Sequence, residues 1–175
     1  MELKFLSWLQ ELHNPLLDQI MIFITKLGDK GTVWIILALL FVVTKKYRRE
    51  GLAMGLGLLI MIIFGNVILK NLIQRPRPFY GKDIDLLIER PLDFSCPSGH
   101  TYSSFVSALV VFFYRKKEGT ILLILASLIA FSRMYLYVHY PSDILLSIVL
   151  ALITALISRW IIEKKIYKNK KENKA

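Results

Sequence analysis

The sequence has few of the features that build a secreted or multidomain protein. A single cysteine, Cys96, excludes an intrachain disulfide. No small-residue cleavage site follows the first charged and apolar segment, so we expect no cleavable signal peptide. The sequence also shows no internal repeat and no separate soluble segment. One domain over residues 1–175 is therefore the expected organisation.

Acidic residues are also scarce. Asp and Glu number 13 against 23 Lys and Arg, which gives a formal net charge of +10. Such a balance can indicate binding to nucleic acid. Here, however, 55% of the residues are hydrophobic, the mean hydropathy is +0.50, and the basic residues stand between apolar runs. This pattern is typical of a multi-pass membrane protein, with the lipid bilayer as its partner and no nucleic acid.

The apolar runs predict an all-α integral membrane bundle of six transmembrane helices within residues 15–162. A short amphipathic helix at 1–14 is expected to lie in the membrane interface before them, or to pack on the bundle as a cap. A polar outer loop follows at 70–99, and a basic tail at 163–175 ends the chain. The expected spans are 16–27, 32–44, 52–69, 101–114, 120–138 and 144–162.

The distribution of basic residues predicts the orientation. Six spans would place the clusters at 45–49 and 115–117 on the same face as the tail. The positive-inside rule makes that face cytoplasmic. We therefore expect a multi-pass protein of the cell (inner or plasma) membrane with both termini in the cytoplasm and the loop 70–99 outside or in the periplasm.

The break between the last two spans carries Arg133, His139 and Asp143. Pro141 suits the first position of a helix, and Asp143 then falls in the first turn, where the helix dipole favours a carboxylate. His139 and Asp143 are four residues apart and can share a hydrogen bond. A histidine oriented by a carboxylate, beside a fixed cation, suits a nucleophile for phosphorus. The alternative is a capping or packing pair.

Two further motifs lie on the same predicted face. Lys70, Arg75 and Arg77 place three cations at the end of the third span, where they suit either phosphate oxygens or lipid headgroups. The acidic side chains of the loop that follows are interpreted as a solvated face rather than as Mg²⁺ ligands, and they are Asp83, Asp85, Glu89 and Asp93.

The second of these motifs is the turn before the fourth span, Pro97-Ser98-Gly99-His100. Free backbone N–H groups at a helix start can bind an anion, and Gly99 allows close approach of a phosphate. His100 suits a general acid. The alternative is an ordinary N-cap turn.

Taken together, the three motifs resemble those of the type 2 phosphatidic acid phosphatase superfamily, whose site is similar to that of vanadium haloperoxidases. The resemblance covers residues 16 to about 162 and includes the early segment Gly28–Gly31. Cys96 and Tyr137 depart from the Phe and Gly expected in many bacterial members. The matching positions are Lys70, Arg77, Pro78, Pro97, Ser98, Gly99, His100, Ser132, Arg133, His139 and Asp143.

The resemblance implies a role for each of these residues. His139 would attack phosphorus and form a phosphohistidine, Asp143 would fix its tautomer, and His100 would protonate the leaving oxygen and later activate water. Arg75 and Ser132 would support the site from behind, with a lipid headgroup as the other expectation for Arg75. The family uses no metal or other cofactor. The phosphoryl oxygens would be held by Lys70, Arg77, Ser98, Gly99 and Arg133.

The expected function is therefore metal-independent hydrolysis of a lipid phosphate or diphosphate at the outer membrane face, with undecaprenyl diphosphate as the preferred substrate. Phosphatidylglycerophosphate, phosphatidic acid and the 1-phosphate of lipid A are the alternative substrates. From other functional classes, a non-catalytic lipid-phosphate binding protein and a transport protein are the rival interpretations. The oligomeric state is left open.

Overall fold

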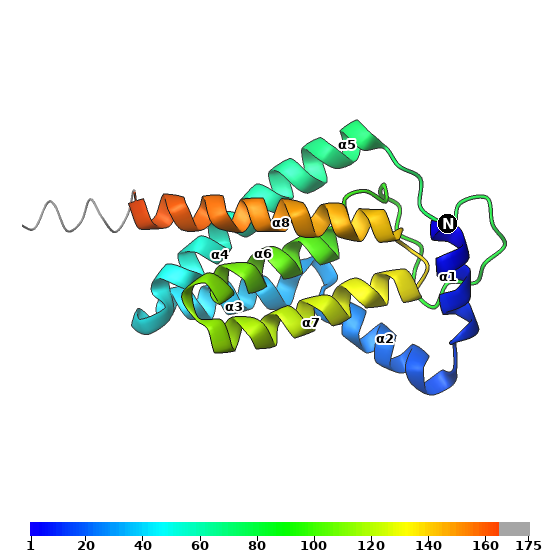
Figure 1. Cartoon of the computed structure of the whole chain (residues 1–175), viewed down its shortest axis with the longest axis horizontal. Helices are drawn as coiled ribbons and strands as arrows, with labels where there is room; N and C mark the ends of the chain where they lie inside the picture. The colour runs from blue at the N-terminus through cyan, green and yellow to red at the C-terminus, as the bar shows by residue number, and fades with distance from the viewer. Residues whose placement is uncertain (165–175) are drawn as a thin grey trace, which may run out of the picture.

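The computed structural model describes residues 1–164, and within them it contains helices and loops but no strand (Figure 1). The segment η3 (Met61–Leu69) is π-helical and joins α4 to α5, so that Lys45–Ile73 is one continuous helix. The short turns η1 (Asp29–Gly31) and η2 (Lys45–Tyr47) flank α3. The α-helices are α1 (Glu2–Glu11), α2 (Pro15–Leu27), α3 (Thr32–Val43), α4 (Arg48–Ile60), α5 (Lys70–Ile73), α6 (Gly99–Tyr114), α7 (Lys116–Tyr135) and α8 (Pro141–Ile161).

The helix α6 forms the centre of the bundle, packed against α4, α7 and α8. Its Val106 is completely buried, and a Cβ atom on Gly57 of α4 would lie 2.9 Å from that side chain, so the two helices approach closely because Gly57 has no side chain. Large apolar side chains of the outer helices, among them Leu39, Val67 and Leu145, are exposed instead. An apolar exterior around a packed interior is the pattern expected of a membrane protein.

Three helices are long and apolar enough to cross a membrane, namely Lys45–Ile73, Lys116–Tyr135 and Pro141–Lys164. The predicted all-α membrane fold is therefore supported by both composition and architecture. The predicted count of six spans is not confirmed, because the predicted spans 16–27, 32–44 and 101–114 fall on α2, α3 and α6, which are not among these three helices.

The helices α2 and α3 do not form the expected hairpin but follow one another in the same direction (Figure 1). Asp18 of α2 lies at the end of α7, where it accepts a hydrogen bond from the Tyr135 hydroxyl (2.6 Å). Trp34 of α3 donates to Ser104 of α6 (2.9 Å), and α3 ends against the start of α4. Their 13 and 12 residues would each extend only about 20 Å, against a hydrocarbon core of about 30 Å. Neither helix is therefore long enough to span that core by itself.

Residues near the two ends of the described chain lie at opposite ends of the bundle (Figure 1). Glu2 accepts a hydrogen bond from the Ser142 N–H at the start of α8 (2.8 Å), whereas Glu163 lies 3.7 Å from Arg49 at the other end. The predicted shared side of the two termini does not anticipate this arrangement of Glu2 and Glu163, and the membrane side of each terminus stays a prediction. Residues 165–175 of the predicted basic tail lie outside the described residues.

The predicted N-terminal amphipathic helix is present as α1, and it packs on the bundle as a cap. Leu6 and Leu9 are completely buried in a cluster with Leu136 and Val138 of the turn between α7 and α8. On the other side of α1, Trp8 is 50% exposed. An interfacial position of that exposed side in a membrane stays a prediction.

Candidate active site

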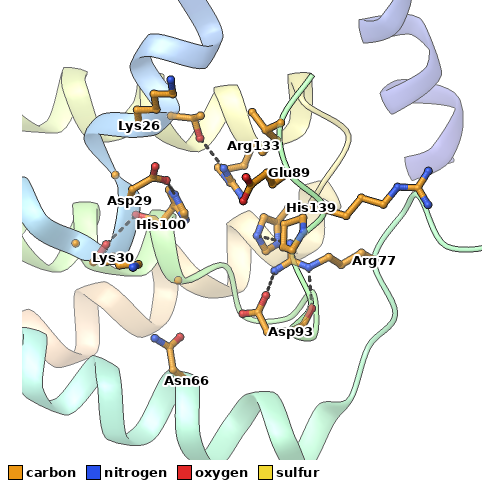
Figure 2. A pocket seen from close by; sticks show the side chains of 18 of the residues that line it. Lys26, Asp29, Lys30, Asn66, Arg77, Glu89, Asp93, His100, Arg133 and His139 are labelled. Atoms are coloured by element: carbon orange, nitrogen blue, oxygen red, sulfur yellow. Dashed lines mark hydrogen bonds and ion pairs between the residues drawn. The ribbon is translucent and has the colours of Figure 1, made fainter. Parts of the chain in front are cut away.

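The predicted site residues gather around one cavity of 820 Å³, at the end of the bundle where α6 and α8 begin (Figure 2). Arg75, Ser98, Ser132 and Asp143 lie outside this lining and are described below. The predicted residues that line the cavity are Lys70, Arg77, Gly99, His100, Arg133 and His139.

The turn between α7 and α8 brings His139 beside Asp143, at a separation slightly longer than the predicted hydrogen bond. Both side chains are buried, and His139 Nδ1 lies 3.6 Å from Asp143 Oδ2. The same carboxylate oxygen accepts hydrogen bonds from the Ser95 hydroxyl (2.5 Å) and from the Tyr140 N–H (2.9 Å). The Ser95 oxygen is 3.5 Å from His139 Nδ1, so Ser95 lies beside both members of the pair. None of the three motifs contains Ser95, and its place in the sequence did not indicate these contacts.

Arg77 touches the other nitrogen of the same histidine. Its NH1 atom lies 3.1 Å from His139 Nε2 and donates to the Val138 carbonyl (2.8 Å). Burial lowers the pKa of His139 well below its ordinary value, against the opposing effect of Asp143, so the ring is neutral at neutral pH. Because arginine can only donate, Nε2 is the acceptor nitrogen and the proton is assigned to Nδ1. The lone pair of Nε2 therefore points towards Arg77.

Two of the predicted phosphate-binding cations are bridged by Asp93. The Asp93 carboxylate accepts from Arg77 NH2 (2.5 Å) and from the Lys70 ammonium, and its backbone carbonyl accepts from Arg77 Nε (2.8 Å). Burial alone would raise the pKa of Asp93, but the hydrogen bonds and charges of Lys70 and Arg77 lower it to about 2. The Asp93 side chain is 55% exposed, as expected for a solvated loop face, but the sequence did not predict its ion pairs with Lys70 and Arg77.

Arg133 enters the cavity from the last turn of α7 and is 3% exposed (Figure 2). Its NH1 donates to the Thr25 hydroxyl of α2 (2.6 Å), while its buried Nε has no hydrogen-bond partner among the described residues. Leaving a buried donor unpaired costs about 1–3 kcal/mol. An anion in the cavity would supply the missing acceptor.

In the turn before α6, Ser98 does not have the free hydroxyl expected of a phosphate-binding residue. The Ser98 hydroxyl accepts from the Thr101 N–H (3.4 Å) and the Thr101 hydroxyl (3.0 Å), so it serves as the N-cap of α6. Gly99 does line the cavity, facing Asn66 of the π-helical segment. The buried Asn66 Oδ1 has no partner among the described residues.

His100 lies across the cavity from Arg77 and forms a second carboxylate–histidine pair (Figure 2). Its Nε2 lies 2.9 Å from Oδ1 of Asp29, which comes from the kink between α2 and α3. The adjacent Lys30 has φ of +52° and Gly31 φ of +68°, and these left-handed conformations turn the chain at this point. The resemblance included the segment around Asp29 but gave that residue no role.

Ser132 and Arg75, the two residues expected to support the site, make different kinds of contact. Ser132 donates to the Ile129 carbonyl (2.7 Å) within its own helix. Arg75 points away from the cavity and donates to Asp143 Oδ1 (2.6 Å) and to Glu2 Oε2 (2.8 Å). Arg75 therefore lies behind the site, where it was expected to support the site residues. In this structure it is paired with two carboxylates and is not free to contact a lipid headgroup.

The arrangement combines a neutral, acceptor-bearing histidine, a second histidine across the cavity, and cations between them. Such a set can transfer a phosphoryl group by nucleophilic and acid–base chemistry. Among residues 1–164, no group of three or more His, Cys, Asp or Glu side chains is placed to hold a metal ion.

Comparisons with known proteins identify relatives of this chain. The model of the PAP2 superfamily matches residues 50–167. Undecaprenyl-diphosphatase BcrC of Bacillus subtilis is 34% identical over 142 residues, which are 81% of this chain and 72% of BcrC. Phosphatidylglycerophosphatase B of Bacillus subtilis is 28% identical over 150 residues, covering 77% and 70% of the two chains. The crystal structure of Aquifex aeolicus LpxE matches with a TM-score of 0.77 and 28% identity, over 90% of this chain and 93% of that one.

The match to the PAP2 model covers more than half of the chain, and the BcrC match covers more than two thirds of that relative. The chain therefore belongs to the PAP2 superfamily and is a lipid phosphatase, a hydrolase acting on phosphate esters.

Proposed function

We propose that the protein removes the terminal phosphate of undecaprenyl diphosphate at the outer face of the cell membrane, through a phosphohistidine on His139. The observation that carries the mechanism is the orientation of His139, whose acceptor nitrogen faces Arg77 at the cavity wall. The similarity to two proteins named undecaprenyl-diphosphatase, from Bacillus subtilis and Sulfolobus acidocaldarius, supports the choice of substrate.

In the first step, His139 Nε2 attacks the terminal phosphorus and a new N–P bond forms. The bond between phosphorus and the bridging oxygen breaks, and the lipid monophosphate leaves with a proton from His100. Asp143 stabilises the positive charge that develops on the ring of His139, because its carboxylate is fixed beside Nδ1.

In the second step, water attacks the phosphohistidine. His100, now neutral, accepts a proton from that water, the N–P bond breaks, and orthophosphate leaves with His139 restored. Burial and the charge of Arg133 lower the pKa of His100 to about 4, so we infer that the negative charge of the bound phosphate, together with Asp29, keeps the proton on His100 for the first step. Its side chain is 20% exposed, so water can reach it for the second step.

The phosphoryl oxygens are held by the cations of the cavity. Lys70 and Arg77 already hold an anionic carboxylate, that of Asp93, in the position we assign to the phosphoryl group. A phosphoryl group carries more charge and three oxygens, so it displaces Asp93 and also meets the unpaired Nε of Arg133. The N–H groups at Gly99, at the start of α6, face the same cavity.

The proposed orientation follows from charge. The end of the bundle opposite the cavity carries the basic clusters 45–49 and 115–117, together with Arg159 of α8. The positive-inside rule then makes that end cytoplasmic and the cavity extracytoplasmic. Because α1 packs on the turn that carries His139, it lies on the same outer side as the cavity.

A second candidate substrate is phosphatidylglycerophosphate, because a relative named phosphatidylglycerophosphatase B is 28% identical. Both substrates present a terminal phosphate on an apolar lipid, and the chemistry proposed above is the same for both. A binding protein without catalysis would need the cations but not the two histidines on opposite sides of the cavity.

The test is orthophosphate release by the purified, detergent-solubilised protein in EDTA, with undecaprenyl diphosphate, phosphatidylglycerophosphate, phosphatidic acid and a lipid A 1-phosphate as substrates. We expect release with preference for undecaprenyl diphosphate, and radioactive phosphate trapped on His139 after rapid quenching in alkali. A folded protein that releases phosphate from none of the four lipids would contradict the proposal.

A further inference from the structure

The N-terminal helix α1 contacts the site through the turn that carries His139. Leu6 and Leu9 are completely buried against that turn. The Gln10 amide donates to the Tyr135 carbonyl (2.8 Å), at the last residue of α7. Nothing in the catalytic motifs of the sequence requires this helix, yet it covers the segment that must hold the catalytic pair in place.

Glu2 extends this contact to the start of α8. Its Oε1 accepts from the Ser142 N–H (2.8 Å), one of the free N–H groups in the first turn of that helix. Its Oε2 accepts from Arg75 (2.8 Å). Burial alone would raise the pKa of Glu2, but the hydrogen bonds from Ser142 and Arg75 lower it below the ordinary value. Glu2 is therefore anionic wherever the pH is above that ordinary value.

Arg75 carries the contact from Glu2 to Asp143. One of its nitrogens donates to Asp143 Oδ1 (2.6 Å) and to the Ser142 hydroxyl (2.6 Å), and its guanidinium lies 3.9 Å from the centre of the Tyr140 ring. The other Asp143 oxygen is occupied by Ser95 and by the Tyr140 N–H. Hydrogen bonds thus fix both oxygens of the Asp143 carboxylate. Arg75 is the cation that binds Oδ1, the oxygen that faces away from His139.

We propose that α1 is a functional part of the active site, in which Glu2 and Arg75 are positioning residues that hold the Asp143 carboxylate against His139. The inference rests on the proposed function. Arg75 is 28% exposed on its side chain, so without Glu2 it can turn towards water. Neither residue lines the cavity, and their loss is therefore expected to slow phosphohistidine formation with little effect on substrate binding.

The first test compares Glu2→Gln with Glu11→Gln, a matched change on an exposed residue of the same helix. For Glu2→Gln we expect kcat to fall about 10-fold, the size of effect seen when a group that orients a site residue is removed, with KM changed less than about 2-fold. Glu11→Gln should match the wild type. The rate of phosphohistidine formation under single turnover should fall with kcat, and thermal unfolding in detergent shows whether each variant is folded.

Arg75 supplies the second comparison. Arg75→Gln should lower kcat at least as much as Glu2→Gln, and Arg75→Lys should restore only part of it, because an ammonium cannot bridge two carboxylates as a planar guanidinium does. The double variant of Glu2→Gln and Arg75→Gln should cost no more than Arg75→Gln alone, since the two residues act in series. If the losses in kcat from the two substitutions were additive, Glu2 would not act through Arg75. A change confined to KM would overturn the positioning role of both residues.

A test that does not depend on enzyme activity asks whether α1 lies on the same side of the membrane as the cavity. Lys4→Cys on α1, Asp85→Cys on the outer loop and Lys117→Cys at the opposite end are all exposed positions for an impermeant maleimide on intact cells. The native Cys96 is a suitable silent background, because burial raises the pKa of its thiol to about 11. Lys4→Cys should label as Asp85→Cys does and unlike Lys117→Cys. Labelling that follows Lys117→Cys would overturn the proposal.

These outcomes separate the two proposals. A wild type that releases no phosphate from any lipid contradicts the proposed function, and the positioning role falls with it, whatever the labelling shows. An active wild type with Glu2→Gln at full kcat contradicts the role of α1 alone.

Discussion

The two histidines of the cavity are held in very different ways. His139 is 1% exposed, and its partner Asp143 is fully buried and receives hydrogen bonds from three other groups. His100 keeps a side chain that is 20% exposed, and its partner Asp29 is 58% exposed. A nucleophile gains from fixed geometry, whereas the group that protonates a leaving lipid and then activates water needs access to both. The contrast therefore supports the assignment of the attacking role to His139 and the acid–base role to His100.

The largest effects should come from the buried pair. His139→Ala removes the nucleophile, and we expect no phosphohistidine and no lipid phosphate hydrolysis above background. Asp143→Asn should lower kcat about 10³- to 10⁴-fold, because an amide favours the wrong tautomer of the ring. Single-turnover trapping of radioactive phosphate measures both variants. Comparable trapping by His139→Ala and the wild type would place the nucleophile elsewhere.

The exposed pair should give a graded result. His100→Ala removes the acid–base group and is expected to cost about 10²- to 10⁴-fold in kcat. Asp29→Asn should cost only about 10-fold, because water can solvate the ring of His100 when the carboxylate is lost, and this is far less than the loss at Asp143. Steady-state kinetics on one lipid substrate measure both changes. Equal losses for Asp29→Asn and Asp143→Asn would remove the distinction drawn between the two pairs.

The contact of Asp93 with Lys70 and Arg77 tests how the cations are kept before substrate binds. Asp93→Asn removes the competing charge, so orthophosphate should inhibit at a concentration several-fold lower than in the wild type, since an ion pair of a half-exposed carboxylate contributes about 1 kcal/mol or less. The lowered pKa of Asp93 keeps its carboxylate charged above its ordinary value of 3.8, and the contact is lost only as the pH falls through about 2. The difference between variant and wild type should therefore persist from pH 5 to 8. Unchanged or weaker inhibition of Asp93→Asn by orthophosphate would show that Asp93 does not occupy the phosphate position.

The sequence predicted much of the site because its motifs stand at the ends of helices that meet. Lys70, His100 and His139 come together around the cavity since each lies near the same end of a long apolar run. The partners that orient them could not be predicted in the same way. Ser95 and Asp29 come from loops, and which loop residue reaches a histidine depends on turn conformations that spacing alone does not determine.

The predicted arrangement of the first two spans differs from the structure for a physical reason. The runs before and after Gly28–Gly31 are both apolar, and hydropathy does not show whether a break reverses the chain or only kinks it. The contacts show a kink, since α2 packs on the end of α7 and α3 continues along α6. Because α2 and α3 run in the same direction, α1 lies at the same end of the bundle as the cavity (Figure 1).

The smallest expected effect comes from Ser98→Ala, which tests whether the Ser98 hydroxyl caps α6 or binds the phosphate. The hydroxyl of Ser98 caps α6 through Thr101, and the Ser98 N–H donates to the Ser147 hydroxyl of α8 (2.8 Å). Ser98→Ala should therefore lower the free energy of unfolding by about 1 kcal/mol, the usual cost of losing an N-cap side chain. KM for the lipid should change less than about 2-fold, because the hydroxyl is directed to its own helix and a lost neutral contact to phosphate would be worth about 1 kcal/mol or more. Thermal unfolding and KM measured on the same preparation distinguish the two: a raised KM at unchanged stability would show that Ser98 turns to the phosphate when substrate binds, as its motif had predicted.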